Sequence, residues 1–318
     1  MTIEDERAIR EGKSFDESVW QTHAFCLISP DSLREQRVGA ILDHLAVAGF
    51  RPVGWREVRV TAQQIDAIAE IQNVGAGSTF RYRALDALFS LGPSVAVRLL
   101  DEVERTAEER YAVLHEIKGG TPPRTRPGSI RHEVGSVNAI LSLLHLSDSP
   151  ANAARESAAI LGPEPLAAFH DGRTLDGYLS VLARTQPRES RDHVAVLGAL
   201  RGRIVAALWT DLTDEGRALA DRLAARGELA RPDAGARLAG LVRPEAAAHP
   251  LLAVLAHPFD PSAAPWDLSE VDLVLRRHGC ACDSWETAVL TTSQYFEPVL
   301  TTKGAHGHAD RDHDLGTD

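Results

Sequence analysis

Short apolar runs alternate with helical segments over the first 160 residues, and glycine or proline punctuates them. Runs typical of buried or half-buried strands occupy 24–29, 50–60 and 94–102. Apolar residues recur at helical spacing over 31–49, 61–71, 81–93 and 107–117. The second strand is irregular around Val58, where a β-bulge would fit. This order of elements predicts an α+β fold in which helices cover an antiparallel sheet.

The later part of the chain has a different composition. Residues 163–250 are rich in Ala, Leu and Arg at helical spacing, which predicts a helical segment that carries no catalytic chemistry. The chain has 318 residues, enough for about two domains, because one domain usually takes ~150 residues. We therefore expect a first domain over 24–162, followed by this helical segment.

Residues 251–302 resemble part of the first unit at a constant offset of 230 positions. The matching pairs are Gly49 with Gly279, Trp55 with Trp285, Thr61 with Thr291, and Gln64 with Gln294. These pairs predict a partial second copy that contains a helix end, a strand and a capping box. This segment has no counterpart of the arginine-rich loop TPPRTRPGSIRHE or of the stretch HLSDS. We therefore expect it to have a structural or pairing role.

Charge and composition exclude several classes of protein. The net charge of −11 argues against general nucleic-acid binding, and no apolar run approaches the ~18 residues of a membrane span. The leader, 1–23, is acidic and polar, unlike a signal peptide, and the three cysteines have no metal-ligand spacing. These features predict a cytoplasmic protein without a metal site of its own. The His- and Asp-rich tail, 303–318, is expected to be flexible.

One histidine lies directly before a predicted helix, in the stretch LLHLSDSP. Ser149 can cap this helix and Pro150 suits its first position, so His145 precedes the positive end of a helix dipole. The apolar run before it is loop or strand, because a residue that precedes proline is disfavoured in a helix. From this stretch alone, His145 is either a buried structural residue or a group that faces an anion.

Several motifs occur together in a fixed order. ISPD ends the first strand at 28–31, LGPSVAV leads into the strand at 94–102, and GGTPP and PGSIR lie within 119–131. HLSDS follows at 145–149, and Glu156 lies eleven residues after the histidine. With these motifs, residues 24 to about 162 resemble the nucleoside diphosphate kinase family. The resemblance implies a ferredoxin-like βαββαβ fold and oligomers built on dimers. Either the chain forms a homodimer or its long C-terminal half replaces a partner's surface.

The resemblance also assigns roles to residues. His145 would be the nucleophile that carries the phosphoryl group, which agrees with the ability of a neutral imidazole to divide one transfer into two steps. Glu156 would hold one ring nitrogen, and Ser147 would reach the glutamate or the phosphate. Arg131 would clamp phosphate oxygens and Thr121 would donate a hydroxyl to them. ATP or GTP would be the donor, with Mg²⁺ carried by the nucleotide.

The sequence departs from the family at three of the site positions. Ser29 stands where the family has a phosphate-binding lysine, Ser142 where it has an asparagine, and His115 where it has an arginine. The aromatic residue that stacks on the base corresponds to Tyr82, subject to the alignment. Compensating cations could come from Arg124 and Arg126 on the loop, or from Arg34 and Arg37 after Ser29; solvated surface arginines are the alternative.

Two functions are compatible with this pattern. The first is a diverged phosphotransferase that acts through a phosphohistidine, on an unidentified small-molecule acceptor other than an ordinary nucleoside diphosphate. The second is a catalytically impaired nucleotide-binding sensor or scaffold, which has lost turnover together with the lysine. A third, cleavage of a nucleotide in the same pocket, has no residue that identifies it.

Overall fold

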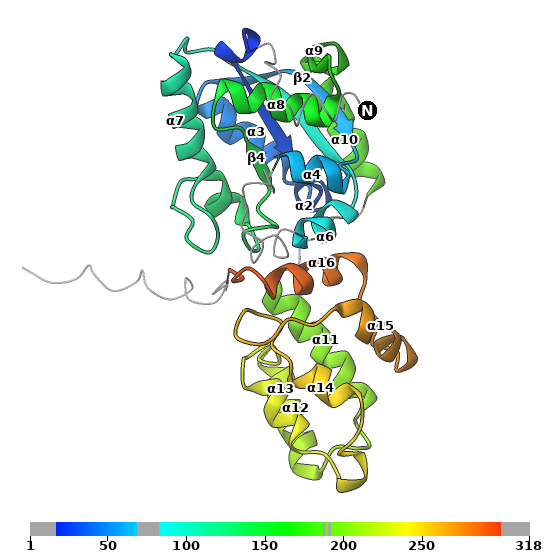
Figure 1. Cartoon of the computed structure of the whole chain (residues 1–318). Helices are drawn as coiled ribbons and strands as arrows, with labels where there is room; N and C mark the ends of the chain where they lie inside the picture. Colours follow the sequence, from blue (N-terminus) through cyan, green and yellow to red (C-terminus); the bar gives the residue numbers. More distant parts are fainter. Residues whose placement is uncertain (1–16, 69–82, 187, 190–191, 300–318) are drawn as a thin grey trace, which may run out of the picture.

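The computed structural model describes residues 17–68, 83–186, 188–189 and 192–299, and it has two parts (Figure 1). The first part is built on five strands: β1 (His23–Ile28), β2 (Phe50–Val58), β3 (Ser94–Asp101), β4 (Leu144–Leu146) and β5 (His170–Asp171). They form one sheet in the order β4-β1-β3-β2-β5, and every neighbouring pair is antiparallel. The first four strands have the order of a ferredoxin-like βαββαβ unit, so the predicted fold class is confirmed.

The register of the sheet places the candidate histidine on the edge strand β4, beside β1. β1 pairs with β3 from His23 opposite Leu100 to Ile28 opposite Val95, and Leu27 of β1 lies opposite His145 of β4. The irregularity predicted near Val58 lies elsewhere, because the register of β2 shifts between Pro52 and Gly54. Proline has no N–H to donate to the ladder, which explains the shift at this position.

Helices connect the strands and cover the sheet. They are α2 (Pro30–Arg34), α3 (Val38–Val47), α4 (Ala62–Ile68), α6 (Ala84–Ser90), α7 (Ala107–Lys118), α8 (Pro150–Leu161), α9 (Pro165–Ala168) and α10 (Leu175–Thr185). Figure 1 shows α8 crossing the sheet. Trp20 of the predicted leader is buried in this core, while residues 1–16 of the leader lie outside the described residues. β5 and the buried Leu175 of α10 also belong to this first part, which therefore extends beyond residue 162.

The second part is helical, as predicted from its composition. Its helices are α11 (His193–Ala207), α12 (Asp214–Ala225), α13 (Ala234–Ala239), α14 (Leu251–Ala256), α15 (Leu268–Arg277) and α16 (Ser284–Ser293). Apolar side chains of these helices form a second core around Leu200, Ile204, Phe259 and Trp285. We call this part the helical unit. None of the helices in the described part of the chain is long and apolar enough to cross a membrane.

The strand predicted within 251–302 is wrong. Trp285 lies in α16, whereas its counterpart Trp55 lies in β2. The reason is local: Asp283 and Glu286 form a capping box that starts a helix ahead of Trp285. Thr291 therefore lies near the end of that helix rather than at a helix start. The described residues of this segment, up to 299, do not repeat the first unit, and the predicted tail lies outside them.

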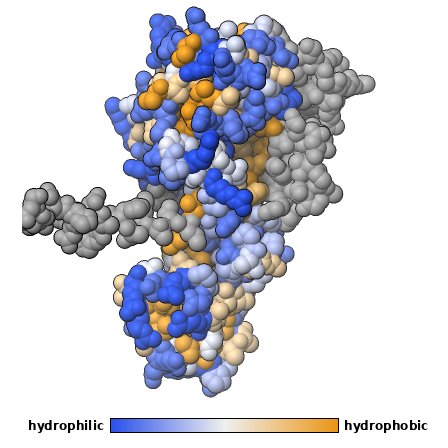
Figure 2. Space-filling view, turned by 90° about the vertical axis from the view of Figure 1, so that its left-hand side faces the viewer, coloured by the Kyte–Doolittle hydropathy of each residue, from blue (hydrophilic) through white to orange (hydrophobic). Residues whose placement is uncertain are grey.

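The two parts are joined through a shared core. Leu88 of α6 and Leu141, which both belong to the first half of the chain, are buried among side chains of the helical unit. The N–H of Val299 donates to the carbonyl oxygen of Val137 at 2.7 Å, and α16 packs against α6. Figure 2 shows hydrophobic residues at the level where the two parts meet, below the first part in this view. The predicted domain boundaries stay predictions.

Candidate functional site

His145 lies on β4, and its side chain is 35% exposed. Its Nε2 atom donates to Oε2 of Glu156 at 2.7 Å, and Glu156 is buried on α8. The helix starts as the sequence predicts, because Pro150 is its first residue and the Ser149 hydroxyl accepts from the N–H of Asn152. The strand and the capped helix thus hold the imidazole and the carboxylate together.

Two further side chains bind the same carboxylate. The Ser147 hydroxyl donates to Oε2 of Glu156 at 2.5 Å, and Nη2 of Arg155 donates to Oε1 at 3.3 Å. An ionised Glu156 that accepts from the imidazole keeps the proton of His145 on Nε2. The lone pair of Nδ1 is then free, and among the described residues nothing hydrogen-bonds to this atom. A half-exposed nitrogen of this kind is suited to nucleophilic attack.

A buried carboxylate positions the backbone that enters β4. Oδ2 of Asp31 accepts from the N–H of Leu143 at 3.1 Å, and Ser32 Oγ donates to the Leu143 carbonyl at 2.6 Å. Leu143 has a φ of +78°, a left-handed conformation that leucine rarely adopts, so these bonds hold a strained residue two positions before His145. Burial raises the pKa of Asp31, and hydrogen bonds from Ser29 and the backbone oppose this rise.

Arg131 lies beside the same segment, in the short π-turn Arg131–Gly135. Its guanidinium donates to the carbonyl oxygens of Ser142, Gly119 and Leu144 at 3.4 to 3.5 Å. These are long hydrogen bonds, and no described carboxylate forms an ion pair with it, so the charge of Arg131 is only weakly satisfied. Burial lowers its pKa, while Asp31 and Asp148 raise it. Leu144 adjoins His145, so this cation lies beside the backbone of the residue that precedes the histidine.

The structure brings some predicted site residues together and leaves others apart. Glu156, Ser147, Arg131 and Ser142 surround the strand that carries His145, and Ser142 Oγ accepts from Arg131 at 3.5 Å. Ser29 is only 6% exposed, and its hydroxyl donates to Asp31 at 2.6 Å. It therefore supports the Asp31 turn.

The loop residues are exposed. Thr121 and Arg124 lie on the loop after α7, and His115 lies on α7 itself. Arg126 is drawn to Glu116, whose carboxylate and carbonyl oxygens it contacts at 4.0 and 3.3 Å. Tyr82 lies outside the described residues.

The arginines considered as substitutes for the family lysine are engaged elsewhere. Arg34 donates to the Leu91 carbonyl at 2.8 Å and to Glu189 at 3.0 Å, and Arg37 pairs with Glu35 at 3.0 Å. Sequence reasoning missed a different cation, Lys118, which is buried at the end of α7. Its Nζ atom donates to the Leu146 carbonyl at 3.4 Å and to Asp148 at 3.2 Å. Lysine is common in the last turn of any helix, so its position gave no signal.

The first part of the chain is similar to known proteins. The family model described as nucleoside diphosphate kinase matches residues 22–166. A nucleoside diphosphate kinase of Fervidobacterium nodosum is 31% identical over 147 residues, which are 46% of this chain and 92% of that protein. One of Psychromonas ingrahamii is 32% identical over 133 residues, 42% of this chain and 85% of that protein.

A solved structure is also similar, an orthorhombic crystal form of the Aquifex aeolicus nucleoside diphosphate kinase. It is 25% identical, covers 43% of this chain and 93% of its own, and has a TM-score of 0.35.

Proposed function

Since the chain belongs to the nucleoside diphosphate kinase family, through residues 22–166, we propose that it is a phosphotransferase that acts through a phosphohistidine at His145. The observation that carries this proposal is the hydrogen bond of 2.7 Å between His145 Nε2 and Glu156. It leaves Nδ1 as the nitrogen available to a nucleotide. The proposed substrates are ATP or GTP as donor and a small-molecule acceptor.

The transfer would run in two steps. The Nδ1 lone pair attacks the γ-phosphorus, the bond from that phosphorus to the β–γ bridging oxygen breaks, and the nucleoside diphosphate leaves. The imidazole becomes positively charged, and Glu156 stabilises this charge through the proton on Nε2. An anionic oxygen of the acceptor then attacks the phosphorus, the P–N bond breaks with its electron pair returning to Nδ1, and the neutral imidazole of His145 is regenerated. Arg131 supplies positive charge to the phosphate oxygens.

Mg²⁺ would enter with the nucleotide. Among the described residues, no group of three or more His, Cys, Asp and Glu side chains could hold a metal ion. The buried carboxylates of Glu156 and Asp31 already accept hydrogen bonds from neighbouring groups. This donor set fits an ion held by the phosphates themselves, where it would neutralise their charge during transfer.

The absence of the family's phosphate-binding lysine, replaced here by Ser29, supports a reaction that differs from that of the family. Ser29 is buried against Asp31, and neither Arg34 nor Arg37 is free to replace the lysine. Removal of one group that stabilises transition-state charge costs about 3 kcal/mol, or roughly a hundredfold in rate. We therefore propose that an ordinary nucleoside diphosphate is not the physiological acceptor. The same observation favours the second candidate, a nucleotide sensor or scaffold without turnover.

One experiment separates the two candidates. The full chain is incubated with γ-³²P-labelled ATP or GTP and Mg²⁺, and the protein is then treated with acid or base. An enzyme acquires a label that is acid-labile and base-stable and that is absent from the His145→Ala variant. A sensor gains thermal stability with the nucleotide and acquires no label. The proposed homodimer and cytoplasmic location stay predictions.

A further inference from the structure

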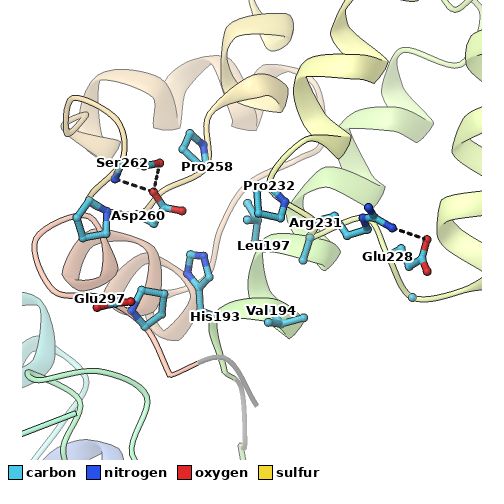
Figure 3. A pocket seen from close by; sticks show the side chains of 14 residues that line it. His193, Val194, Leu197, Glu228, Arg231, Pro232, Pro258, Asp260, Ser262 and Glu297 are labelled. Carbon is cyan, nitrogen blue, oxygen red and sulfur yellow. Dashed lines mark hydrogen bonds and ion pairs between the residues drawn. The ribbon is translucent and has the colours of Figure 1, made fainter. Parts of the chain in front are cut away.

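A second cavity lies in the helical unit, away from His145. Its volume is about 680 Å³, enough for a small organic molecule. It opens between the start of α11, the connection 227–232 and the loop 258–262 (Figure 3). Apolar side chains dominate its wall, among them Val194, Leu197 and Pro232. No residue of the candidate phosphotransfer site lines it.

Two polar groups point into this apolar cavity (Figure 3). The His193 side chain is 96% buried, since its residue is 4% exposed, and its Nδ1 atom has no hydrogen-bond partner among the described residues. Burial lowers the pKa of His193 to about 4, so the ring is neutral at pH 7. Oδ1 of Asp260 accepts from both the N–H and the hydroxyl of Ser262. Its second oxygen faces the cavity.

A buried arginine holds the walls in place. Arg201 is fully buried, and its guanidinium donates at 2.8 to 3.2 Å to the carbonyl oxygens of Leu229, Arg231, Leu255 and His257. These carbonyls belong to the two segments that flank the cavity. Gly235 permits this packing, because a Cβ there would lie 2.9 Å from the guanidinium carbon. The cavity is therefore preformed, which lowers the entropy cost of binding.

The charge of the lining is negative. Asp260, Glu228 and Glu297 line the cavity, and Arg231 is the one arginine or lysine among the described residues that line it. Arg231 already pairs with Glu228 at 3.6 Å and with Asp233 at 3.4 Å. The charge of Arg201 lies behind the wall, where it is solvated by carbonyl oxygens. Asp260 accepts hydrogen bonds from Ser262 but forms no ion pair with any described residue. A carboxylate of this kind at an apolar surface favours a cation over an anion.

We propose that this cavity binds a small organic amine with an apolar body. The ammonium group would contact Asp260, and the body would pack against Val194, Leu197 and Pro232, with the neutral imidazole of His193 as a hydrogen-bonding neighbour. Such a site is independent of the phosphotransfer chemistry at His145.

Three ligands with one indole body and different charges test the proposal: tryptamine, indole-3-ethanol and indole-3-acetate. Binding to the full chain is measured by calorimetry and by ligand-observed NMR, in the presence of saturating ADP. We expect tryptamine to bind most tightly, and the Asp260→Asn variant to bind it about 10- to 100-fold more weakly, because one charge-assisted hydrogen bond is lost. Val194→Trp, which fills the cavity, should weaken the binding of all three ligands.

The matched control is Glu245→Gln, which removes one exposed carboxylate elsewhere on the helical unit and should bind tryptamine as the parent does. Circular dichroism checks that each variant is folded. Equal binding of tryptamine and indole-3-acetate, unchanged binding by Asp260→Asn, or no binding at millimolar ligand would each overturn the proposal.

Discussion

Nε2 of His145 lies 2.7 Å from Oε2 of Glu156, across eleven positions that contain a strand end, a capped turn and the first turns of α8. This separation means that the contact between the imidazole and the carboxylate depends on where α8 starts. If α8 began one residue later, the carboxylate would rotate by about 100° about the helix axis and leave the ring.

The Glu156→Gln variant should form phosphohistidine about 10- to 100-fold more slowly, because a neutral amide holds the Nε2 proton less strongly than a carboxylate. Quenched-flow measurement of ³²P incorporation checks this. Glu164→Gln is the control, since Glu164 is exposed and its side chain caps no helix. Equal rates for the two variants would show that Glu156 has only a structural role.

The Arg131→Ala variant should bind an ATP analogue at least about tenfold more weakly, because Arg131 is a half-buried cation with weakly satisfied hydrogen bonds. Arg126→Ala should change the affinity by less than about twofold, since Arg126 is an exposed partner of Glu116. Calorimetry with a non-hydrolysable analogue gives both dissociation constants. Similar losses of affinity in Arg131→Ala and Arg126→Ala would contradict the proposal that Arg131 binds the phosphates.

The Ser29→Lys variant should raise the rate of phosphoryl transfer to ADP by about 10- to 100-fold, because it returns a cation to the turn that holds Asp31. Ser90→Lys adds the same charge at an exposed position on α6 and should have no effect. The assay is transfer from labelled GTP to ADP. Folded Ser29→Lys protein with the parental rate would mean that the missing lysine does not limit turnover.

Glu35 should make the protein less stable as pH rises. Burial, and secondarily the Asp31 carboxylate, raise the pKa of Glu35 from 4.5 to about 7, against the effect of Arg37. Between these values the folded state binds more protons than the unfolded state, so its stabilising contribution is complete below pH 4.5 and is lost as pH passes 7.

Urea denaturation at pH 5 and pH 8 measures this effect. Relative to Glu35→Gln, the parent protein should lose on the order of 1–3 kcal/mol more free energy of unfolding over this range. Glu108→Gln, at an exposed position, should behave as the parent does. An identical pH dependence of the free energy of unfolding in the parent and in Glu35→Gln would refute the raised pKa of Glu35.

The Asn138→Ala variant should lose about 2–4 kcal/mol of stability, because a fully buried side chain makes four hydrogen bonds. Its amide donates to Thr292 at 2.8 Å and Ser293 at 3.0 Å, and its oxygen accepts from the N–H groups of Ile140 and Leu141 at 2.9 Å. Ser293→Ala removes one of these bonds and should cost about 1 kcal/mol. Equal urea midpoints for the parent protein and Asn138→Ala would argue against a core shared by the first part and the helical unit.

The local features of the site were predictable from the sequence. The buried strands, the Ser149 cap and the spacing of His145 and Glu156 each depend on residues within about a dozen positions, and the structure contains them. The repeat failed for the same reason: Trp285 was matched to a strand by spaced identities, while the local capping box at Asp283 specified a helix.

Contacts between distant segments were not predictable. The bond from Leu143 to Asp31 joins residues 112 positions apart, and no local pattern links them. The role of Asp31 therefore depends on the fold and not on its neighbours in the sequence. Likewise, nothing in the helical composition around Arg201 distinguishes a fully buried arginine from a solvated one. The register shift at Pro52 depends on the partner strand, so its position was also missed.

The burial of α6 within the helical unit has an evolutionary consequence. Ala84, Leu88 and Leu91 lie in the first part of the chain, yet they are buried in the core of the helical unit. A gene shortened to encode only residues up to 186 would give a protein in which these apolar side chains are exposed to water. Selection would then act on both halves together, so that neither is easily shed by truncation or exchanged by recombination.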